Sequence, residues 1–245
     1  GTVTITGTAT QNQTLTASNN LTDADGLSAI GYTWLRDGNA INAATQSTYT
    51  LTQADVGKKI TVNASYTDLL GTAESVSSTA TSLIANVNDA PNGMVTITGT
   101  ATQNQTLTAS NNLTDADGLG AISYAWLNNG AVIPNAKQST YTLTQADVGK
   151  AISVKASYTD VLGTAENVSS TATSLIANVN DVPTGTVTIT GAVTQDQTLT
   201  ASNNLVDADG LGKITYTWLR DGMAISDATQ STYILTQSDV SKKIS

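Results

Sequence analysis

The sequence LTDADGLSAIGYTWLRDG at residues 21–38 returns in nearly the same form at residues 113–130 and 205–222. Each copy joins an acidic turn to a run in which apolar and polar residues alternate, and each closes with Asp-Gly or Asn-Gly. Alternation with a period of two is typical of a strand with one buried face, and the closing pair is typical of a two-residue hairpin turn. The stretch therefore predicts an antiparallel β-structure.

The rest of the chain repeats at the same spacing of 92 residues, because GTVTITG at residue 1 returns as GMVTITG at residue 93 and as GTVTITG at residue 185. A period this long exceeds the repeat of a solenoid and indicates tandem domains that each bury their own core. We expect two whole domains, residues 1–92 and 93–184, followed by a truncated third, residues 185–245.

Within the first repeat, alternating segments are separated by turn sequences, and no helix longer than one turn is expected. The expected strands are residues 2–10, 13–18, 30–36, 48–51, 60–66 and 74–85, with a short strand or loop at 41–44 and one helical turn at 53–57. Six or seven short strands favour a two-sheet sandwich, and a tryptophan on the third strand matches the immunoglobulin plan. The predicted fold is all-β, with tandem immunoglobulin-like β-sandwich domains in an elongated array.

Each repeat has one tryptophan, namely Trp34, Trp126 and Trp218. These residues share a strand face with isoleucine and tyrosine, so we expect them in the core; the alternative is a platform on which sugars stack. The chain has no cysteine, so apolar packing must replace the disulfide that often accompanies this tryptophan.

The charge balance excludes several classes of function. A net charge of −9 and a pI near 4.2 argue against binding to nucleic acid or to anionic lipid. No apolar run is long enough to insert directly into a membrane. Histidine is absent and no nucleophile motif occurs, so we expect no enzymatic activity.

The string Y-x-W-L-x-D-G, followed by T-Y-x-L-T-x-x-D-V-G-K-x-I-x-V, resembles the bacterial Ig-like repeats of large surface adhesins of the biofilm-associated and repeats-in-toxin types. The resemblance implies extender modules on the bacterial cell surface, in an extracellular protein that supports cell adhesion and biofilm formation. The sequences NVNDAP at residues 86–91 and NVNDVP at 178–183 also resemble the calcium-binding interdomain linkers of cadherin-like repeats.

Strand order gives calcium binding a geometric basis. The chain enters a sandwich at one end, descends the first strand and returns along the second. The acidic turn and the turn between the last two strands therefore lie beside the incoming linker. In the second repeat this brings together Asp89, Asp115, Asp117 and Asp160, whose oxygens suit Ca²⁺. Asn88 either adds an oxygen ligand or caps the turn. The alternative is that these acids are ordinary solvated turn residues.

The same positions recur in the other repeats. The first repeat has Asp23, Asp25 and Asp68 without an incoming linker, and the second junction has Asp181, Asp207 and Asp209. The corresponding calcium sites are expected to be weaker.

Three functions compete at this stage. The first is a structural extender in contact with neighbouring repeats and stiffened by Ca²⁺. The second is a module that itself binds carbohydrate or another ligand, for which the most variable segment, residues 39–45 against 131–137, is the first candidate. The third is self-association through exposed sheet edges into filaments or a biofilm matrix. Near-identity of the repeats favours the extender.

Overall fold

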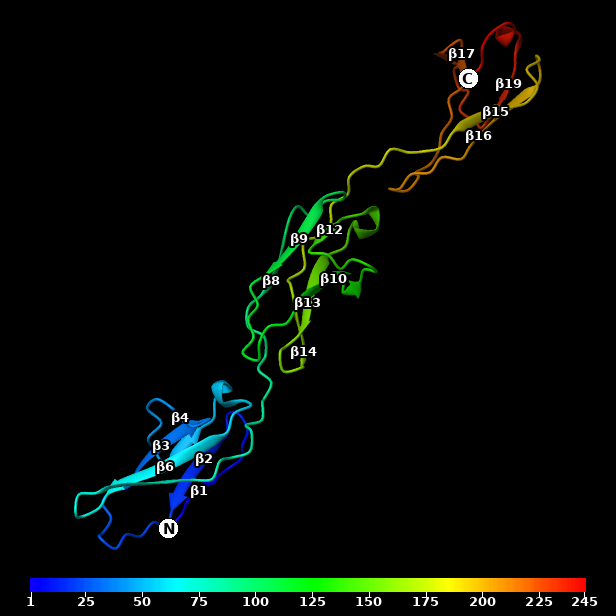
Figure 1. Ribbon diagram of the computed structural model, residues 1–245. Coiled ribbons are helices and arrows are strands. Elements are labelled where there is room, and N and C mark those ends of the chain that lie inside the picture. Colours follow the sequence, from blue (N-terminus) through cyan, green and yellow to red (C-terminus); the bar gives the residue numbers. More distant parts are fainter. The chain divides into compact units, whose positions relative to one another are not determined.

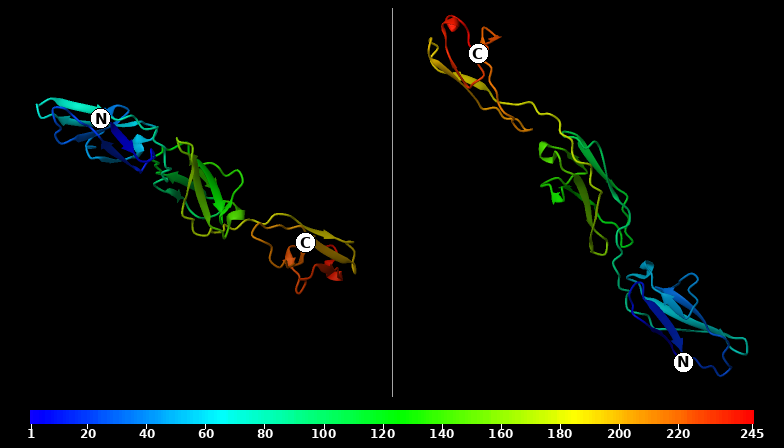
Figure 2. Two further views of the ribbon diagram at one scale, coloured as in Figure 1. Left: turned by 90° about the horizontal axis from the view of Figure 1, so that it is seen from below. Right: turned by 180° about the vertical axis from the view of Figure 1, so that it is seen from behind.

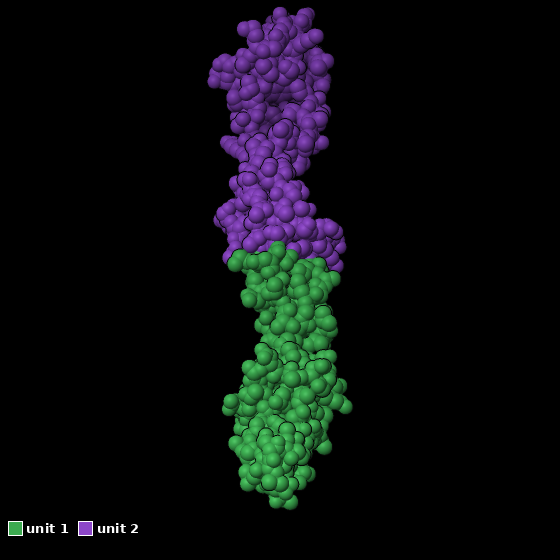
Figure 3. Space-filling model, turned by 60° about the vertical axis from the view of Figure 1, so that its left-hand side comes forward, with its two compact units in different colours: residues 1–95, 111–123, 155–169 green, residues 96–110, 124–154, 170–245 purple.

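The computed structural model describes residues 1–245, and the protein is all-β apart from three one-turn 3-10 helices (Figure 1). Contacts divide the chain into two compact units (Figure 3). One comprises residues 1–95, 111–123 and 155–169, and the other comprises residues 96–110, 124–154 and 170–245. The division into three domains at residues 1–92, 93–184 and 185–245 stays a prediction.

The first repeat lies in the first unit and contains seven strands in two antiparallel sheets. Its elements are β1 (Val3–Thr6), β2 (Thr14–Asn19), β3 (Gly31–Arg36), β4 (Asn39–Ala40), β5 (Thr48–Thr50), η1 (Gln53–Asp55), β6 (Ile60–Thr67) and β7 (Ala73–Ser77). One sheet has the order β1-β2-β5 and the other has the order β4-β3-β6-β7.

The two sheets, whose strands can be followed in Figures 1 and 2, pack as a β-sandwich around one core. Leu15 and Ala17 come from the first sheet, and Trp34, Ile60 and Val62 come from the second; all are at most 5% exposed. The inward positions follow the period-two pattern, because alternate side chains of a strand point to opposite faces.

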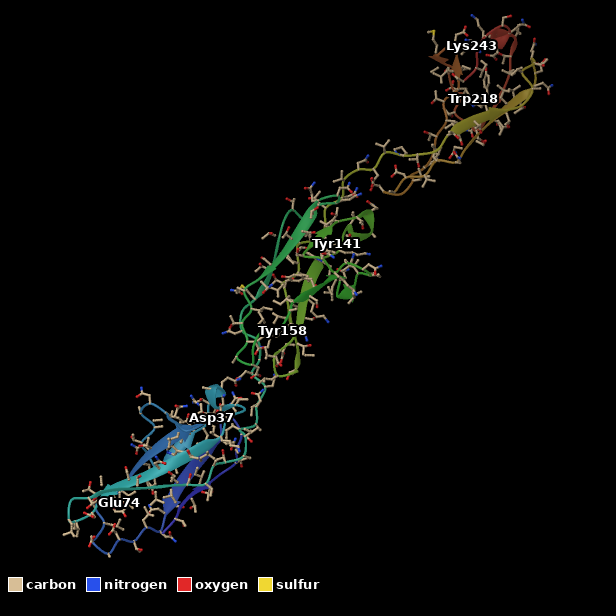
Figure 4. All side chains as sticks on the ribbon, in the orientation of Figure 1. Asp37, Glu74, Tyr141, Tyr158, Trp218 and Lys243 are labelled. Atoms are coloured by element: carbon tan, nitrogen blue, oxygen red, sulfur yellow. The ribbon has the colours of Figure 1, made fainter.

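The tryptophans occupy the same buried position in all three repeats. Trp34, Trp126 and Trp218 are at most 2% exposed, and each indole nitrogen donates to a backbone carbonyl at 2.9 Å. A tyrosine ring packs on each indole with centroids 5.5–5.7 Å apart. A sugar-stacking platform would need an open ring face, and burial leaves none (Trp218 is labelled in Figure 4).

The hairpin between β3 and β4 shows why the closing Asp-Gly pair matters. Arg36 pairs with Asn39 across the turn, and Asp37 and Gly38 both have positive φ, at 45° and 82°. Two successive positive φ angles match the right-handed twist of the strands, and Asn or Asp followed by Gly accepts them at low cost.

The second and third repeats reuse these elements. The second contains β8 (Val95–Thr98), β9 (Thr106–Asn111), β10 (Ser123–Asn128), β11 (Ala131–Val132), β12 (Thr140–Thr142), η2 (Gln145–Asp147), β13 (Ile152–Thr159) and β14 (Ala165–Ser169). The third contains β15 (Val187–Thr190), β16 (Thr198–Asn203), β17 (Leu219–Arg220), β18 (Met223–Ala224), β19 (Thr232–Ile234) and η3 (Gln237–Asp239). The chain therefore consists of tandem β-sandwich repeats.

Two strand predictions were wrong in extent. The first strand ends at Thr6, because Gly7 bends the chain with φ at 120°. The expected last strand at residues 74–85 is interrupted: β7 ends at Ser77, and the chain then crosses to form isolated parallel bridges at Ile84 and Ala85. The segment at residues 41–44 is a loop, because it forms no strand beyond β4.

Candidate functional site

The acidic turn of the second repeat is organised by Asp115 and Asp117. The carboxylate of Asp115 accepts a hydrogen bond from the amide of Asp117 at 2.8 Å, a local contact that the short Asp side chain favours. Gly118 completes the turn with φ at 94°, and a Cβ atom there would meet the side chain of Val161 at 2.6 Å. A glycine is therefore required where this turn approaches the β13–β14 turn.

The linker at residues 86–92 lies against this turn. The amide of Asp89 donates to Asp117 Oδ2 at 2.8 Å, and Asp89 Oδ2 accepts from Gln11 Nε2 at 2.8 Å. Gln11 is 3% exposed, and its Oε1 accepts from the amide of Val87 at 3.1 Å. One glutamine of the first repeat therefore holds both the backbone and the acid of the linker.

Asp117 is the central acceptor of the junction and is 4% exposed. Its Oδ1 accepts from Gln53 Nε2 at 2.9 Å, while its Oδ2 accepts from the linker. A second contact comes from Asn88, whose Nδ2 donates to Glu166 Oε1 at 2.7 Å. The first repeat and the linker thus both contact carboxylates of the second repeat.

Of the two remaining predicted acids, Asp115 lies in this turn and Asp160 lies in the β13–β14 turn beside it. Asp115 Oδ2 accepts from the hydroxyl of Tyr158, and burial followed by this carboxylate raises the pKa of Tyr158 well above its usual range (Figure 4 labels Tyr158). Asp160 is 5% exposed, and its Oδ1 accepts from the amide of Thr164 at 2.8 Å. Its Oδ2 is buried and has no hydrogen-bond partner.

The structure connects three of the four junction acids directly, since Asp89 donates to Asp117 and Asp117 donates to Asp115. Asp160 joins them through its own turn, where the Val161 amide donates to the Gly118 carbonyl at 3.1 Å. No group of three or more His, Cys, Asp or Glu side chains is gathered in a metal-binding arrangement. The calcium site stays a prediction.

In the first repeat the equivalent acids are organised by hydrogen bonds within that repeat. Asp23 accepts from the amide of Asp25 at 2.9 Å and from the hydroxyl of Tyr66 at 2.8 Å. Asp68 accepts from the amides of Leu70 and Thr72, and the Thr72 backbone hydrogen bond lowers the pKa of Asp68 despite an opposing contribution from burial. The carboxylate of Asp25 is exposed.

The second junction repeats part of the first. Gln103 Nε2 donates to Asp181 Oδ2 at 2.9 Å, and the amide of Asp181 donates to Asp209 Oδ2 at 2.8 Å. Asp207 accepts from the amide of Asp209 at 2.8 Å, and Gln145 Nε2 donates to Asp209 Oδ1 at 3.2 Å. The glutamine contacts therefore recur. The hydrogen bond from Gln145 to Asp209, at 3.2 Å, is longer than the equivalent bond from Gln53 to Asp117, at 2.9 Å.

Sequence reasoning missed four participants of the first junction: Gln11, Gln53, Tyr158 and Glu166. The glutamines lie 78 and 64 residues from the acids that they contact, so no local pattern connects them. The hydroxyls of Tyr66 and Tyr158 reach the acidic turn from the strand that precedes the last turn of each repeat, a contact that alternation along a strand does not predict. The one available signal was the return of Gln11 and Gln53 as Gln103 and Gln145.

None of the helices has the length and apolar character that crossing a membrane requires.

The chain matches no protein-family model and no curated protein sequence. Among solved structures it is similar to three N-terminal domains of the Highly Immunogenic Outer Capsid protein of bacteriophage RB49, with 20% identity, coverage of 95% of this chain and 78% of that chain, and a TM-score of 0.28. It is also similar to the FN1–FN3 domains of chicken CNTN1, with 13% identity, 96% and 87% coverage and a TM-score of 0.27. A third similar structure is extracellular domains 3–5 of Drosophila OTK, with 12% identity, 97% and 84% coverage and a TM-score of 0.29.

Proposed function

We propose that the chain is a structural extender: a series of β-sandwich repeats whose junctions bind Ca²⁺ and are stiffened by it. The parent is a secreted adhesin on the bacterial cell surface, where the repeats support cell adhesion and biofilm formation without catalysing a reaction. The string shared with bacterial Ig-like adhesin repeats supports this setting. The junction geometry supports the mechanism.

The observation that carries the proposal is the unpartnered Oδ2 atom of Asp160, buried at the junction between the first two repeats. A buried carboxylate oxygen without a donor is costly, because it has lost water and gained no hydrogen bond. A cation beside it removes that cost. Gln53 Oε1 is a second buried oxygen without a partner, on a side chain that already contacts Asp117.

The available ligands are hard oxygens, which is the chemistry that Ca²⁺ prefers. They are the carboxylates of Asp89, Asp115, Asp117 and Asp160 and the amide oxygen of Gln53. The amide nitrogens of Gln11 and Gln53 and the hydroxyl of Tyr158 now donate to three of these carboxylates. Side-chain rotations that release these donors would free the oxygens for an ion.

Stiffening of the junction follows from thermodynamic linkage between Ca²⁺ binding and the contact of the linker with the second repeat. An ion held by the linker and by the second repeat together binds only when the two are in contact, so it stabilises that arrangement. Because the ion must also order the linker, we expect an affinity of about 10⁻⁴–10⁻³ M, as in extracellular modules. The equivalent acids of the other repeats supply the same kind of oxygen ligands. They are Asp23, Asp25 and Asp68 in the first repeat and Asp181, Asp207 and Asp209 at the second junction.

Calorimetric titration of the chain with Ca²⁺, compared with the variant Asp115→Asn plus Asp117→Asn, tests the proposal. The isosteric change removes two charges but keeps amide oxygens in the turn. A matched control, Asp196→Asn plus Asp227→Asn, removes two charges elsewhere. We expect the junction variant to lose the tightest binding event and the control to keep it.

Small-angle scattering in Ca²⁺ and in chelator separates binding from stiffening. We expect chelator to broaden the distribution of interatomic distances while circular dichroism still reports folded sandwiches. Binding with unchanged scattering would overturn the stiffening role. Equal Ca²⁺ binding by the junction variant and by the unmodified chain would overturn the site itself.

A further inference from the structure

Two asparagines of the chain are followed directly by glycine. They are Asn92, where the linker meets the second repeat, and Asn129, in the hairpin between β10 and β11. Both are exposed. Because glycine has no Cβ atom, the backbone nitrogen after such an asparagine is unshielded, and this pair is the one most prone to lose its side-chain amide in water. The hydrogen bonds around the two asparagines differ, and the difference bears on which of them reacts.

The side chain of Asn129 is held by the neighbouring strand. Its Oδ1 accepts a hydrogen bond from the Ala151 amide at 2.9 Å, and its own amide donates to the Ala151 carbonyl at 2.9 Å. The equivalent Asp37 of the first repeat accepts from the Lys59 amide in the same way, at 2.9 Å. Loss of the side-chain amide requires its carbon to approach the next backbone nitrogen, so these hydrogen bonds must break first.

The side chain of Asn92 makes no hydrogen bond, and neither does the amide of Gly93. The backbone of Asn92 is held by one isolated bridge, in which its amide donates to the Thr114 carbonyl at 2.8 Å and the Thr114 amide donates to its carbonyl at 2.8 Å. Opening this bridge is sufficient to bring the exposed side chain to the Gly93 nitrogen. Fewer hydrogen bonds therefore oppose the reaction at Asn92 than at Asn129.

The fold requires the glycine that makes Asn92 reactive. Gly93 has φ at 110°, and a Cβ atom there would meet the carbonyl oxygen of Asn112 at 2.6 Å. Gly185 has the same surroundings in the third repeat, with φ at 106° and the carbonyl oxygen of Asn204 at 2.5 Å. A larger residue cannot take this place without a shift of the backbone.

The fold does not require the asparagine. Thr184 occupies the equivalent position in the third repeat, where its amide donates to the Val206 carbonyl at 2.8 Å and the Val206 amide donates to its carbonyl at 2.9 Å. The same bridge therefore forms around a threonine, whose side chain has no amide to lose. Asn92→Thr is a variant whose backbone contacts this chain already contains.

We propose that Asn92 is a modification site, at which the side chain deamidates spontaneously in water to aspartate and isoaspartate. The Gly93 nitrogen loses its proton to hydroxide and attacks the side-chain carbonyl carbon of Asn92. A C–N bond forms, and the NH₂ group takes a proton from water and leaves as ammonia. Water then adds to one carbonyl of the resulting cyclic imide and breaks one of its two C–N bonds. The inference is independent of calcium and of the extender function.

The modification changes the point where the linker joins the second repeat. Both products add a carboxylate beside Thr114, which directly precedes Asp115 of the acidic turn. Aspartate keeps the original backbone. Isoaspartate lengthens the backbone by one methylene group, so the two hydrogen bonds with Thr114 lose their register. The reaction therefore alters the charge of this connection and, in isoaspartate, its geometry.

Peptide mapping by mass spectrometry, during incubation of the folded full chain in mildly alkaline buffer, tests the proposal. We expect Asn92 to deamidate about tenfold or more faster than Asn129, because additional hydrogen bonds must open at Asn129. In urea the two rates should converge, since the hydrogen bonds that distinguish the two asparagines are lost.

Hydroxylamine gives a second readout, because it attacks the cyclic imide and cleaves the chain there. We expect fragments 1–92 and 93–245 from the folded chain. Asn92→Thr should abolish this cleavage. Asp37→Asn provides a matched control, since it creates an asparagine–glycine pair whose side chain the Lys59 amide still holds. The new pair should react as slowly as Asn129.

Three results would overturn the proposal. In the first, Asn92 stays intact in the folded chain under conditions in which the chain in urea reacts. In the second, Asn92 and Asn129 react at equal rates in the folded chain, which removes the role of the hydrogen bonds. In the third, cleavage by hydroxylamine persists at the same place in Asn92→Thr, which puts the imide at another residue.

Discussion

Arg36 in the first repeat and Asn128 in the second occupy equivalent positions, and each donates a hydrogen bond to the buried aspartate of its own repeat. Arg36 Nε donates to Asp55 Oδ1 at 2.7 Å, and Asn128 Nδ2 donates to Asp147 Oδ1 at 2.6 Å. The acids are 0% and 2% exposed. A cation in one repeat and a neutral amide in the other therefore support the same structure.

The other hydrogen-bond donors to this buried aspartate, a tyrosine hydroxyl and a threonine amide, are the same in the first and second repeats. In the second repeat, Asp147 Oδ2 accepts from the Tyr141 hydroxyl at 2.8 Å and from the Thr144 amide at 2.9 Å. In both repeats burial acts to raise the carboxyl pKa, and the hydrogen bonds outweigh it and lower the pKa. The comparison teaches that the buried acid needs a donor at each oxygen, and that charge is secondary.

The largest expected effect tests whether the two cores are otherwise equivalent. Trp34→Ala and Trp126→Ala should each lower the free energy of unfolding by about 3–5 kcal/mol, because a large aromatic leaves a cavity. The two losses should agree, since both indoles are fully buried and make the same hydrogen bond. Native-state hydrogen exchange of amides in each repeat of the full chain measures them. Clearly unequal losses would mean that more than the Arg–Asn exchange separates the repeats.

The next effect separates the donor from the charge. Arg36→Ala should cost about 1–3 kcal/mol, because Asp55 Oδ1 loses its donor inside the protein. Arg36→Asn should cost less than about 1 kcal/mol, since an amide at this position already serves the second repeat. Chemical denaturation of the two variants provides the measurement. If asparagine is as damaging as alanine, the cation is essential and the comparison fails.

Whether a feature of the fold or of the site could be predicted from the sequence depended on how far apart in the chain its residues lie. The period-two pattern predicted the buried faces of Leu15, Trp34 and Ile60, and Asp37-Gly38 predicted its hairpin, because both signals are local. The pattern did not predict that the last strand breaks after Ser77, since residues 78–85 contain no glycine or proline that would mark the break. It also gave no partner for Asp55 or Asp117, because alternation tells which face a residue occupies and not what lies across from it.

The loss of folding stability at low pH is a smaller test of the comparison between Arg36 and Asn128. Since the folded-state pKa values of Asp55 and Asp147 lie below the ordinary value, both acids contribute stability above about pH 4, and this is lost as pH falls through the folded-state pKa. Arg36→Asn should raise the pKa of Asp55, because a cation no longer favours the carboxylate. Carboxyl carbon shifts followed by NMR report it. An unchanged pKa would show that Arg36 acts only as a hydrogen-bond donor.

The smallest effect is expected at high pH, in the ionisation of the two tyrosines that donate hydrogen bonds to these acids. Burial and then Asp147 raise the pKa of Tyr141 to about 12 (Figure 4 labels Tyr141). Burial and then Asp55 also raise the pKa of Tyr49, but there the charge of Arg36 acts in the opposite direction.

We therefore expect Tyr49 to ionise before Tyr141, and Asn128→Arg to lower the pKa of Tyr141. Because the folded-state pKa of Tyr141 exceeds the ordinary value of about 10, the stability from the neutral phenol is complete below about pH 10 and is lost as pH rises through about 12. NMR of chains labelled at the tyrosine ζ carbon resolves the two rings. Ionisation of Tyr141 first, or no response to Asn128→Arg, would show that the charge at this position does not reach the phenol, and that the two repeats differ in identity at this residue but not in electrostatics.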